Sequence, residues 1–519
     1  MNAKPDIIFF MVDELSAKWF EAAIDGASEL PNFNWLLEHG CYFRNTFTSN
    51  PVCCPTRATL ATGLTTRGHG VLENGYQLDP TLPTFMRTLQ RNGWRTGAFG
   101  KAHFQPHFRG LYPDYRIYGF DETHITEDSR GGEWLDWVEE QFPEHFDSVL
   151  ATIWATQIPE FEHYGQKKIN LQERIEKIRS EFRWETEDHP KNTSLAAVLP
   201  FPEEACQTNW ITMHALDFIR RVPQRQPLYA HISYVQPHGP FHTFAEYMDK
   251  VDSSKIPELV PAEWTQDAHA PLELKRRKPF GPQTHDVEYC RTCYFADLAH
   301  LDSQLGEVLS ALRSRGRLAD TYIIFLSDHG DMLFDHGLLG KEEKHYDACI
   351  RVPLIISGPG MQEGAKLDHF VQLEDICPTI LDLAGQNLPL MPKMGPYLHA
   401  EQQEIPVHSG YSLRGMCTGG KARSERNCIY TESYNTIDSA HPGQWARTIR
   451  TRKYRYTFYP DGYGEQLFDM ENDPDEQSNL VADPNFQHIR AELRDRLLEL
   501  IIMQDYPKTR RELFALGVH

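Results

Sequence analysis

Two nearly continuous apolar runs in this chain each end in a polar pair that is able to bind a metal. The run DIIFFMV, from Asp6 to Val12, stops at Asp13 and Glu14, and a later run, residues 322–327, stops at Asp328 and His329. Runs of this kind are typical of strands buried on both faces of a sheet. Because sites in open α/β sheets form at the carboxyl ends of strands, the pattern predicts a site at these strand ends.

Helical and extended patterns alternate along the rest of the chain. We expect helices over residues 32–39, 82–92 and 294–312, and strands over residues 96–99 and 228–235. This alternation predicts an α/β protein. Towards the C-terminus, alternating residues around a Pro-Asp-Gly turn predict a hairpin, and residues 486–501 read as an amphipathic helix.

The 519-residue chain is expected to hold one large and one smaller unit. We predict a catalytic α/β domain over residues 1–390 and a smaller C-terminal subdomain over residues 391–519. Residues 121–226 are rich in Trp, Glu, His and Phe and have no clean period. We interpret this segment as an insertion that shapes a pocket or an oligomer contact.

Two adjacent cysteines occur in the stretch SNPVCCPTRATLATGL, and the residues after them tell the two apart. Cys53 is followed by Pro55 and Arg57 in the pattern Cys-x-Pro-x-Arg, which resembles the signature of the sulfatase family. In that family the first residue of the signature is oxidised to formylglycine. A register starting at Cys54 would need proline at Thr56, so the resemblance implies that Cys53 is modified.

Further motifs of the sulfatase family follow in the family's order. They are GWRT from Gly93, GKAH from Gly100, QPHGP from Gln236, SDHGD from Ser327 and GK from Gly340. The C-terminal segment, with QLFD from Gln466 and NDP from Asn472, also resembles the family. Within the superfamily, the sequence also resembles the phosphonate monoester hydrolases. It implies an alkaline-phosphatase-like α/β/α sandwich with a large mixed, mostly parallel sheet, and a C-terminal α+β subdomain with a short antiparallel sheet.

The resemblance also implies one divalent metal held by both strand ends and by residue 53. The expected ligands are Asp13, Glu14, Cys53, Asp328 and His329. Carboxylate oxygens suit Ca²⁺, which we expect first, with Mg²⁺, Mn²⁺ or Zn²⁺ as alternatives. The imidazole of His329 shifts the balance towards Mn²⁺ or Zn²⁺.

The family pattern assigns the remaining site residues. Arg57 would hold the formylglycine hydrate, and Lys101 and Lys341 would clamp the sulfuryl oxygens. His238 would protonate the leaving group, and His103 would take a proton from the hydrate so that a covalent sulfo-enzyme intermediate expels sulfate. Asn74 matches a substrate-contacting Asn in some relatives, with a turn Asn as the alternative. Lys344 competes with Lys341 for the lysine role.

The formal net charge of −21 excludes nucleic acid and anionic membranes as natural partners. A compact cluster of cations at the site would still focus an anionic substrate. The N-terminus lacks the features of a secretory signal, so we expect a cytoplasmic protein, or a periplasmic or secreted one if a signal was removed. Expected partners are a small-molecule or saccharide sulfate ester, a formylglycine-generating or anaerobic sulfatase-maturating enzyme, and a second copy of the chain in a homo-oligomer.

The leading functional hypothesis is therefore a metal-dependent sulfuric ester hydrolase that releases inorganic sulfate. The alternative is a phosphonate monoester or phosphodiester hydrolase of the same superfamily. Those relatives tend to have Tyr and Thr in place of the Lys-x-His element, so Lys101 and His103 favour sulfate esters. A third reading is a non-catalytic protein that binds sulfated ligands, against which the intact nucleophile, ligands and acid all count.

Overall fold

Strand β1 (Asp6–Val12) lies in the middle of a large sheet, where it is parallel to β8 (Thr321–Ser327) on one side and to β6 (Leu228–Ser233) on the other. Every residue of β1 is buried. The predicted buried strands are thus confirmed, and they are direct neighbours. This computed structural model describes residues 4–153, 158–165, 169–280, 286–341, 344–386, 409–420, 426–434 and 445–504.

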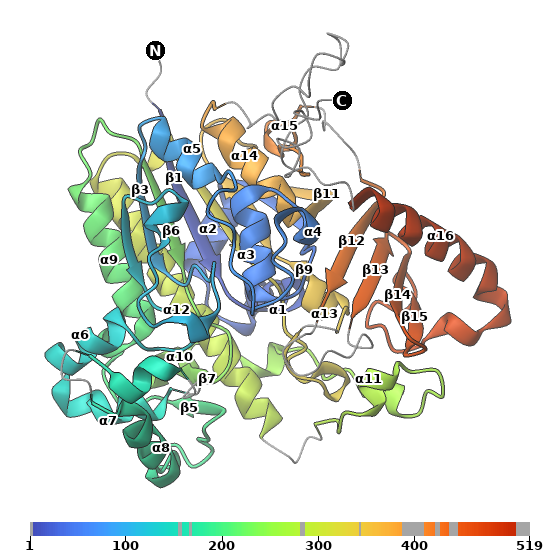
Figure 1. Cartoon of the computed structure of the whole chain (residues 1–519), viewed down its shortest axis with the longest axis horizontal. Helices are drawn as coiled ribbons and strands as arrows, with labels where there is room; N and C mark the ends of the chain where they lie inside the picture. Colours follow the sequence, from blue (N-terminus) through green and yellow to red (C-terminus); the bar gives the residue numbers. More distant parts are fainter. Residues whose placement is uncertain are drawn as a thin grey trace, which may run out of the picture.

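The large sheet is mixed but mostly parallel (Figure 1). Its order is β11-β2-β10-β8-β1-β6-β3-β4, and the short β9 also pairs with β2. Only β10 and β9 run antiparallel to their neighbours. The bounds of the strands not yet given are β2 Gly40–Phe47, β3 Arg95–Gly100, β4 Glu122–Ile125, β9 Arg351–Val352, β10 Leu354–Ser357 and β11 Ala365–Gln372. This topology confirms the predicted fold class.

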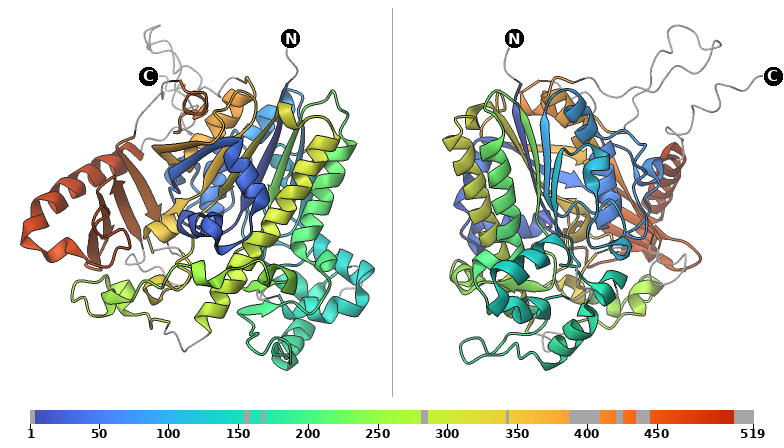
Figure 2. Two further views of the ribbon diagram at one scale, coloured as in Figure 1. Left: turned by 180° about the vertical axis from the view of Figure 1, so that it is seen from behind. Right: turned by 60° about the vertical axis from the view of Figure 1, so that its left-hand side comes forward.

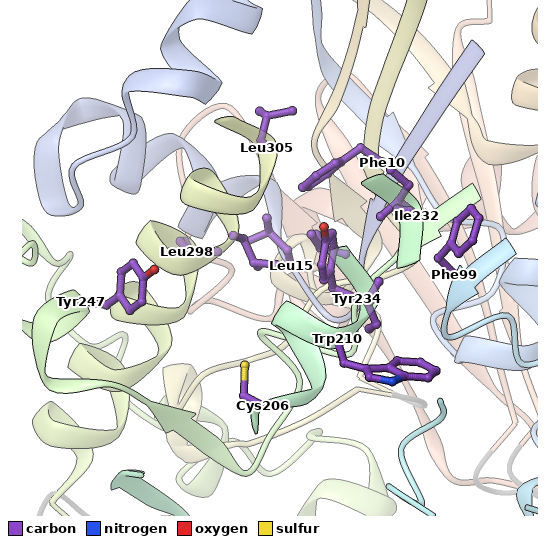
Figure 3. Close-up of a cluster of buried hydrophobic side chains, with 14 of the residues drawn as sticks. Phe10, Leu15, Phe99, Cys206, Trp210, Ile232, Tyr234, Tyr247, Leu298 and Leu305 are labelled. Carbon is purple, nitrogen blue, oxygen red and sulfur yellow. The ribbon is translucent and has the colours of Figure 1, made fainter. Parts of the chain in front are cut away.

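Alternate residues of β1 enter two separate cores, because successive side chains of a strand point to opposite faces. Ile8, Phe10 and Val12 face a core that includes residues of several helices. Among them are α1 (Ala17–Ala22), α2 (Pro31–Glu38), α9 (Gln207–Arg221) and α12 (Val287–Ser314). Figure 2 shows α9 and α12 side by side across this face. Figure 3 shows Phe10 of β1, Trp210 of α9 and Leu298 of α12 within this core.

The opposite face of β1, formed by Ile7, Phe9 and Met11, packs into the second core. Residues of α3 (Cys53–Thr62), α5 (Phe85–Arg91) and α14 (Ile376–Leu383) line that core. The helices on both faces of the sheet make an α/β/α sandwich. The signature cysteines open α3 and therefore lie on this second face.

A small antiparallel sheet follows near the C-terminus, at the edge of the molecule in Figure 1. Its strands are β12 (Cys428–Ser433), β13 (Ala446–Thr451), β14 (Tyr454–Tyr459) and β15 (Gly464–Asp469), in that order. The predicted hairpin is the pair β14 and β15. The predicted helix is α16 (Gln487–Gln504), whose Leu493 and Leu497 cover the sheet.

The segment over residues 121–226, predicted to be an insertion, includes two elements of the large sandwich. Strand β4 extends the sheet beside β3, and α9 packs against β3 and β6. Between β4 and α9 lie α6 (Glu133–Gln141), α7 (Phe146–Ala151) and α8 (Leu171–Glu181), at the lower left of Figure 1. The polar sequence of β4 hid its membership of the sheet, because an edge strand needs no continuous apolar run.

Among the helices that the structure describes, none combines the length and the apolar composition that crossing a bilayer requires.

Candidate active site

The ends of β1 and β8 place two carboxylates side by side. Val12 is aligned with Ser327 in the parallel register, so Asp13 and Asp328 leave the sheet at the same edge. The backbone N–H of Glu14 donates to Asp328 Oδ1 at 3.2 Å. Both aspartates are completely buried. The site thus begins where the strand pattern predicted it.

Cys53 enters this carboxylate pair from the first turn of α3. Its Sγ lies 3.2 Å from Nε2 of His329 and 3.8 Å from Oδ1 of Asp13. Burial, with the nearby Asp13 carboxylate, raises the pKa of the Cys53 thiol well above its ordinary value. A thiol kept protonated in this way is a poor nucleophile, which fits a residue that acts only after chemical conversion.

Cys54 points elsewhere. Its Sγ donates to the carbonyl of Tyr76 at 3.2 Å, and the residue lies in the core behind α3. The side-chain oxygen of Asn74, which is half-buried, accepts the backbone N–H of Cys54 at 3.0 Å. Asn74 therefore fixes the start of α3 directly beside the nucleophile position. The two adjacent cysteines occupy different environments, as the sequence register predicted.

Four ligand atoms lie together, and they fit a divalent cation. Oxygens of Asp13 and Asp328, Sγ of Cys53 and a ring nitrogen of His329 are all within 4.8 Å of one another, and all four residues are buried. Nδ1 of His329 lies 3.1 Å from the carbonyl of Gly330 and donates to it, which leaves Nε2 to face the group. Two carboxylates and one imidazole suit Ca²⁺, Mg²⁺, Mn²⁺ or Zn²⁺.

The two aspartates titrate differently, although both are buried. Burial raises the pKa of Asp328 to about 6, and the neighbouring Asp13 adds to the shift. Burial would also raise the pKa of Asp13, but Lys101 and Arg57 hold it well below its usual range. The pair therefore carries concentrated negative charge that either cations of the chain or a metal must offset.

Arg57 ties this acidic centre to the sheet. Its Nε donates to Asp328 Oδ2 at 2.9 Å, and its Nη1 donates to Ser233 Oγ at 2.9 Å, so that β6 and the end of β8 are linked by one side chain. Nη2 lies 3.7 Å from Asp13 Oδ2. The guanidinium thus holds both aspartates while remaining almost completely buried.

Two lysines bring further positive charge to the same place. Nζ of Lys101 contacts Asp13, and Nζ of Lys341 lies 3.2 Å from Oε1 of Glu14. Both ammonium groups act on Cys53, whose thiol pKa they lower against the larger effect of burial. The predicted cations therefore gather around the nucleophile position, where they are able to bind the oxygens of an anionic ester.

Glu14 lies outside the four-residue ligand group, although the sequence predicted it as a ligand. Its carboxylate is 3.2 Å from Nε2 of His238 as well as 3.2 Å from Nζ of Lys341. Burial raises the pKa of Glu14 well above its ordinary value. In this structure Glu14 links the predicted general acid to a predicted substrate-binding lysine.

The two predicted catalytic histidines contact different residues of the site. Burial, together with Lys341, lowers the pKa of His238 to about 4, and its Nδ1 lies 2.7 Å from the carbonyl of Gly239. His103 is fully buried, and its ligand atom lies within 4.8 Å of both Cys53 and Asp128. Neither ring nitrogen of His103 has a hydrogen-bond partner among the described residues. His103 is therefore free to accept or pass a proton beside residue 53.

Three neighbours of the site have no catalytic role in the sequence-based prediction: His107, Glu127 and Asp128. The His107 ring stacks on His103 at 3.9 Å between centroids, and Glu127 Oε1 accepts the backbone N–H of His103 at 2.9 Å. Glu127 and Asp128 follow β4, so they repeat the pattern of an acidic pair after a strand. The acidic pair is a signal in the sequence, but the short polar β4 before it has no apolar pattern that marks it as a strand.

Two protein-family models together match nearly the whole chain. A family model described as Sulfatase matches residues 5–386, and a model described as N-sulphoglucosamine sulphohydrolase, C-terminal, matches residues 335–503. The chain is 25% identical over 520 residues to an arylsulfatase of Clostridium perfringens, covering 96% of this chain and 94% of that protein. It is 27% identical to a choline-sulfatase of Rhizobium meliloti, covering 93% of this chain and 83% of the relative.

A solved structure shows the same fold. The phosphonate monoester hydrolase of Agrobacterium radiobacter superposes with a TM-score of 0.74 at 22% sequence identity, and 96% of each chain is covered. The chain therefore has the same fold as that structure, in agreement with the α/β/α sandwich predicted from the sequence.

Proposed function

The chain belongs to the sulfatase family, and from that premise we propose that it hydrolyses sulfate monoesters with residue 53 as the nucleophile. One observation carries the proposal: Cys53 lies among Asp13, Asp328 and His329, with Arg57, Lys101 and Lys341 around it. A nucleophile position between hard ligands and cations is suited to attack on an anionic ester.

Two groups that the family implies would complete the site. Asp13, Asp328 and His329 would hold a divalent cation, Ca²⁺ first, which supplies Lewis-acid chemistry when it is bound. Cys53 would be the precursor of formylglycine, whose hydrate supplies an oxygen nucleophile. A formylglycine-generating or anaerobic sulfatase-maturating enzyme would have to act on the chain before it becomes active.

The cations of the chain would bind and orient the ester. Arg57 is fixed by Asp328 and Ser233, so its guanidinium holds a constant position beside residue 53. Lys101 and Lys341 approach residue 53 and would bind the sulfuryl oxygens. Positive charge held in a buried site stabilises the charge that spreads over these oxygens during transfer.

The histidines would move the protons. His238 lies against Glu14, whose raised pKa keeps a proton available to the pair, and His238 would pass that proton to the leaving-group oxygen. His103 faces residue 53 without a competing hydrogen bond from the described residues, so it would take a proton there. Separate histidines for the leaving group and for residue 53 allow both transfers within one turnover.

The test is the anion released from esters of one phenol, with one sulfate of a different leaving group added. The matured protein would be offered an aryl sulfate, an aryl phosphonate monoester and an aryl phosphodiester, with choline sulfate as a non-aryl sulfate. We expect the highest kcat/KM for a sulfate ester, and no release by Cys53→Ala. A higher kcat/KM for the phosphonate monoester or the phosphodiester would overturn the proposal in favour of the alternative hydrolase.

A further inference from the structure

Asp128 contributes a buried negative charge to the site that the predicted catalytic set does not include. It follows β4 at the same edge of the sheet and is 4% exposed. Its two carboxylate oxygens lie 2.6 and 2.7 Å from Nζ of Lys101. The ligand atoms of Asp128, Cys53 and His103 are within 4.8 Å of one another. The carboxylate is therefore close to residue 53.

Lys101 is shared between two carboxylates with different tasks. Asp13 belongs to the candidate metal ligands, so its charge is directed to a cation when one is bound. Asp128 is outside that four-residue group, and its charge is left to act on Lys101. Lys101 and Asp128 are both buried, so solvent screens their interaction only weakly. Asp128 thus holds the Lys101 ammonium in place and, together with Asp13, offsets its charge.

This offset matters for the charge of the substrate. A sulfate monoester, a phosphonate monoester and a phosphodiester carry one negative charge each, whereas a phosphate monoester carries two at neutral pH. A fixed carboxylate near the bound oxygens repels a doubly charged ester about twice as strongly as a singly charged one, and the low dielectric of a buried site strengthens that repulsion. Lys101 without its carboxylate would favour the doubly charged ester.

We propose that Asp128 is a positioning and specificity-determining residue that makes the site select singly charged esters over doubly charged ones. The inference rests on the proposed function for the location of the ester. It does not depend on whether the preferred singly charged ester contains sulfur or phosphorus.

The experiment compares Asp128→Asn, which removes the charge, with Asp128→Glu, which keeps it. For each variant, kcat/KM is measured on an aryl sulfate, an aryl phosphodiester and an aryl phosphate monoester with the same phenol. The ester ratio is kcat/KM for the phosphate monoester divided by kcat/KM for the better singly charged ester. We expect Asp128→Asn to raise this ratio by about 10-fold or more, equivalent to about 1.4 kcal/mol. Asp128→Glu should keep the wild-type ratio even if its overall rate falls.

A matched control is Asp302→Asn. Asp302 is a buried aspartate on α12 that accepts backbone N–H groups of α2, so its loss affects the fold and not the site. We expect its ester ratio to equal that of the wild type. If Asp128→Asn does not fold, Asp128→Ser removes the same charge with a smaller side chain.

An equal loss on all esters in Asp128→Asn, with an unchanged ratio, would overturn the inference and leave Asp128 a purely structural role. A second readout does not need turnover: inorganic phosphate binding, measured by thermal unfolding below and above its second pKa. Asp128→Asn should gain more affinity for the doubly charged ion than for the singly charged one. If the wild type prefers the phosphodiester to the sulfate, the proposed function fails. The ratio of kcat/KM for the phosphate monoester to that for the phosphodiester still tests the role of Asp128.

Discussion

Sγ of Cys53 lies 3.2 Å from Nε2 of His329, although the two residues are 276 positions apart in the sequence. The helix α3 and the end of strand β8 bring them together. This contact connects the signature motif to the metal-capable strand end. It places the residue to be modified inside the ligand group before any modification has occurred.

We expect Cys53→Ala to abolish sulfate release and Cys54→Ala to retain it. Cys53 faces the ligand group, whereas Cys54 packs in the core behind α3 and bonds to Tyr76. Loss of the buried Cys54 sulfur should lower the free energy of unfolding by about 1 kcal/mol. Release assays and thermal unfolding of the two variants measure these effects.

Mass spectrometry supplies a direct check on the same residue. In matured protein, the tryptic peptide that contains Cys53 should have the lower mass of an aldehyde in place of a thiol, whereas Cys54 should remain a thiol. Active protein with both thiols unmodified would contradict formylglycine chemistry. The opposite mutational pattern would mean that the register of the signature is wrong.

The amount of metal that variants retain should show whether Glu14 is a ligand like the members of the four-residue group. We expect Asp328→Asn to lose bound metal on dialysis, because Asp328 belongs to the four-residue ligand group. Glu14→Gln should retain more metal, because its carboxylate contacts His238 and Lys341 in this structure. Metal content per protein, determined by elemental analysis, decides between them. Equal metal loss in both variants would show that Glu14 is a ligand, as the sequence predicts.

His238→Ala should slow esters with poor leaving groups more than esters with good ones. A phenol of low pKa leaves without protonation, whereas an alcohol needs the proton that His238 would donate. We therefore expect a steeper dependence of log kcat/KM on leaving-group pKa in the variant, with differences of about 10²-fold for the poorest leaving group. A parallel shift for all esters would exclude His238 as the acid.

Acid should destabilise the protein through buried histidines, with His69 as a clear case. Burial lowers the pKa of His69 from 6.5 to about 3, and its Nδ1 accepts the backbone N–H of Val71 at 3.1 Å. In the unfolded chain His69 binds a proton near pH 6.5, whereas in the folded chain it does so only near pH 3. Stability from neutral His69 is therefore present above pH 6.5 and is lost as the pH falls towards 3.

His69→Gln tests this dependence, because a glutamine oxygen also accepts a hydrogen bond but does not titrate. Urea unfolding at several pH values should give a flatter loss of stability below pH 6.5 for the variant than for the wild type. An identical slope in both proteins would show that His69 does not contribute to the acid transition.

The sequence by itself determined the buried strands β1 and β8, the register of the signature at Cys53, and the presence of cationic motifs at Arg57, Lys101 and Lys341. These features depend on local pattern: a doubly buried strand must be apolar throughout, and a motif has fixed spacing. Helix α12 was recognised from its apolar period for the same reason.

Only the tertiary structure decided which side chains meet. It placed β4 and α9 in the sandwich, brought Asp128 to Lys101, stacked His107 on His103 and directed Glu14 to His238 and Lys341. An edge strand such as β4 has no apolar run to reveal it. The contacts at a sheet edge depend on strand order, and strand order is set by packing across the whole chain, which no local pattern records.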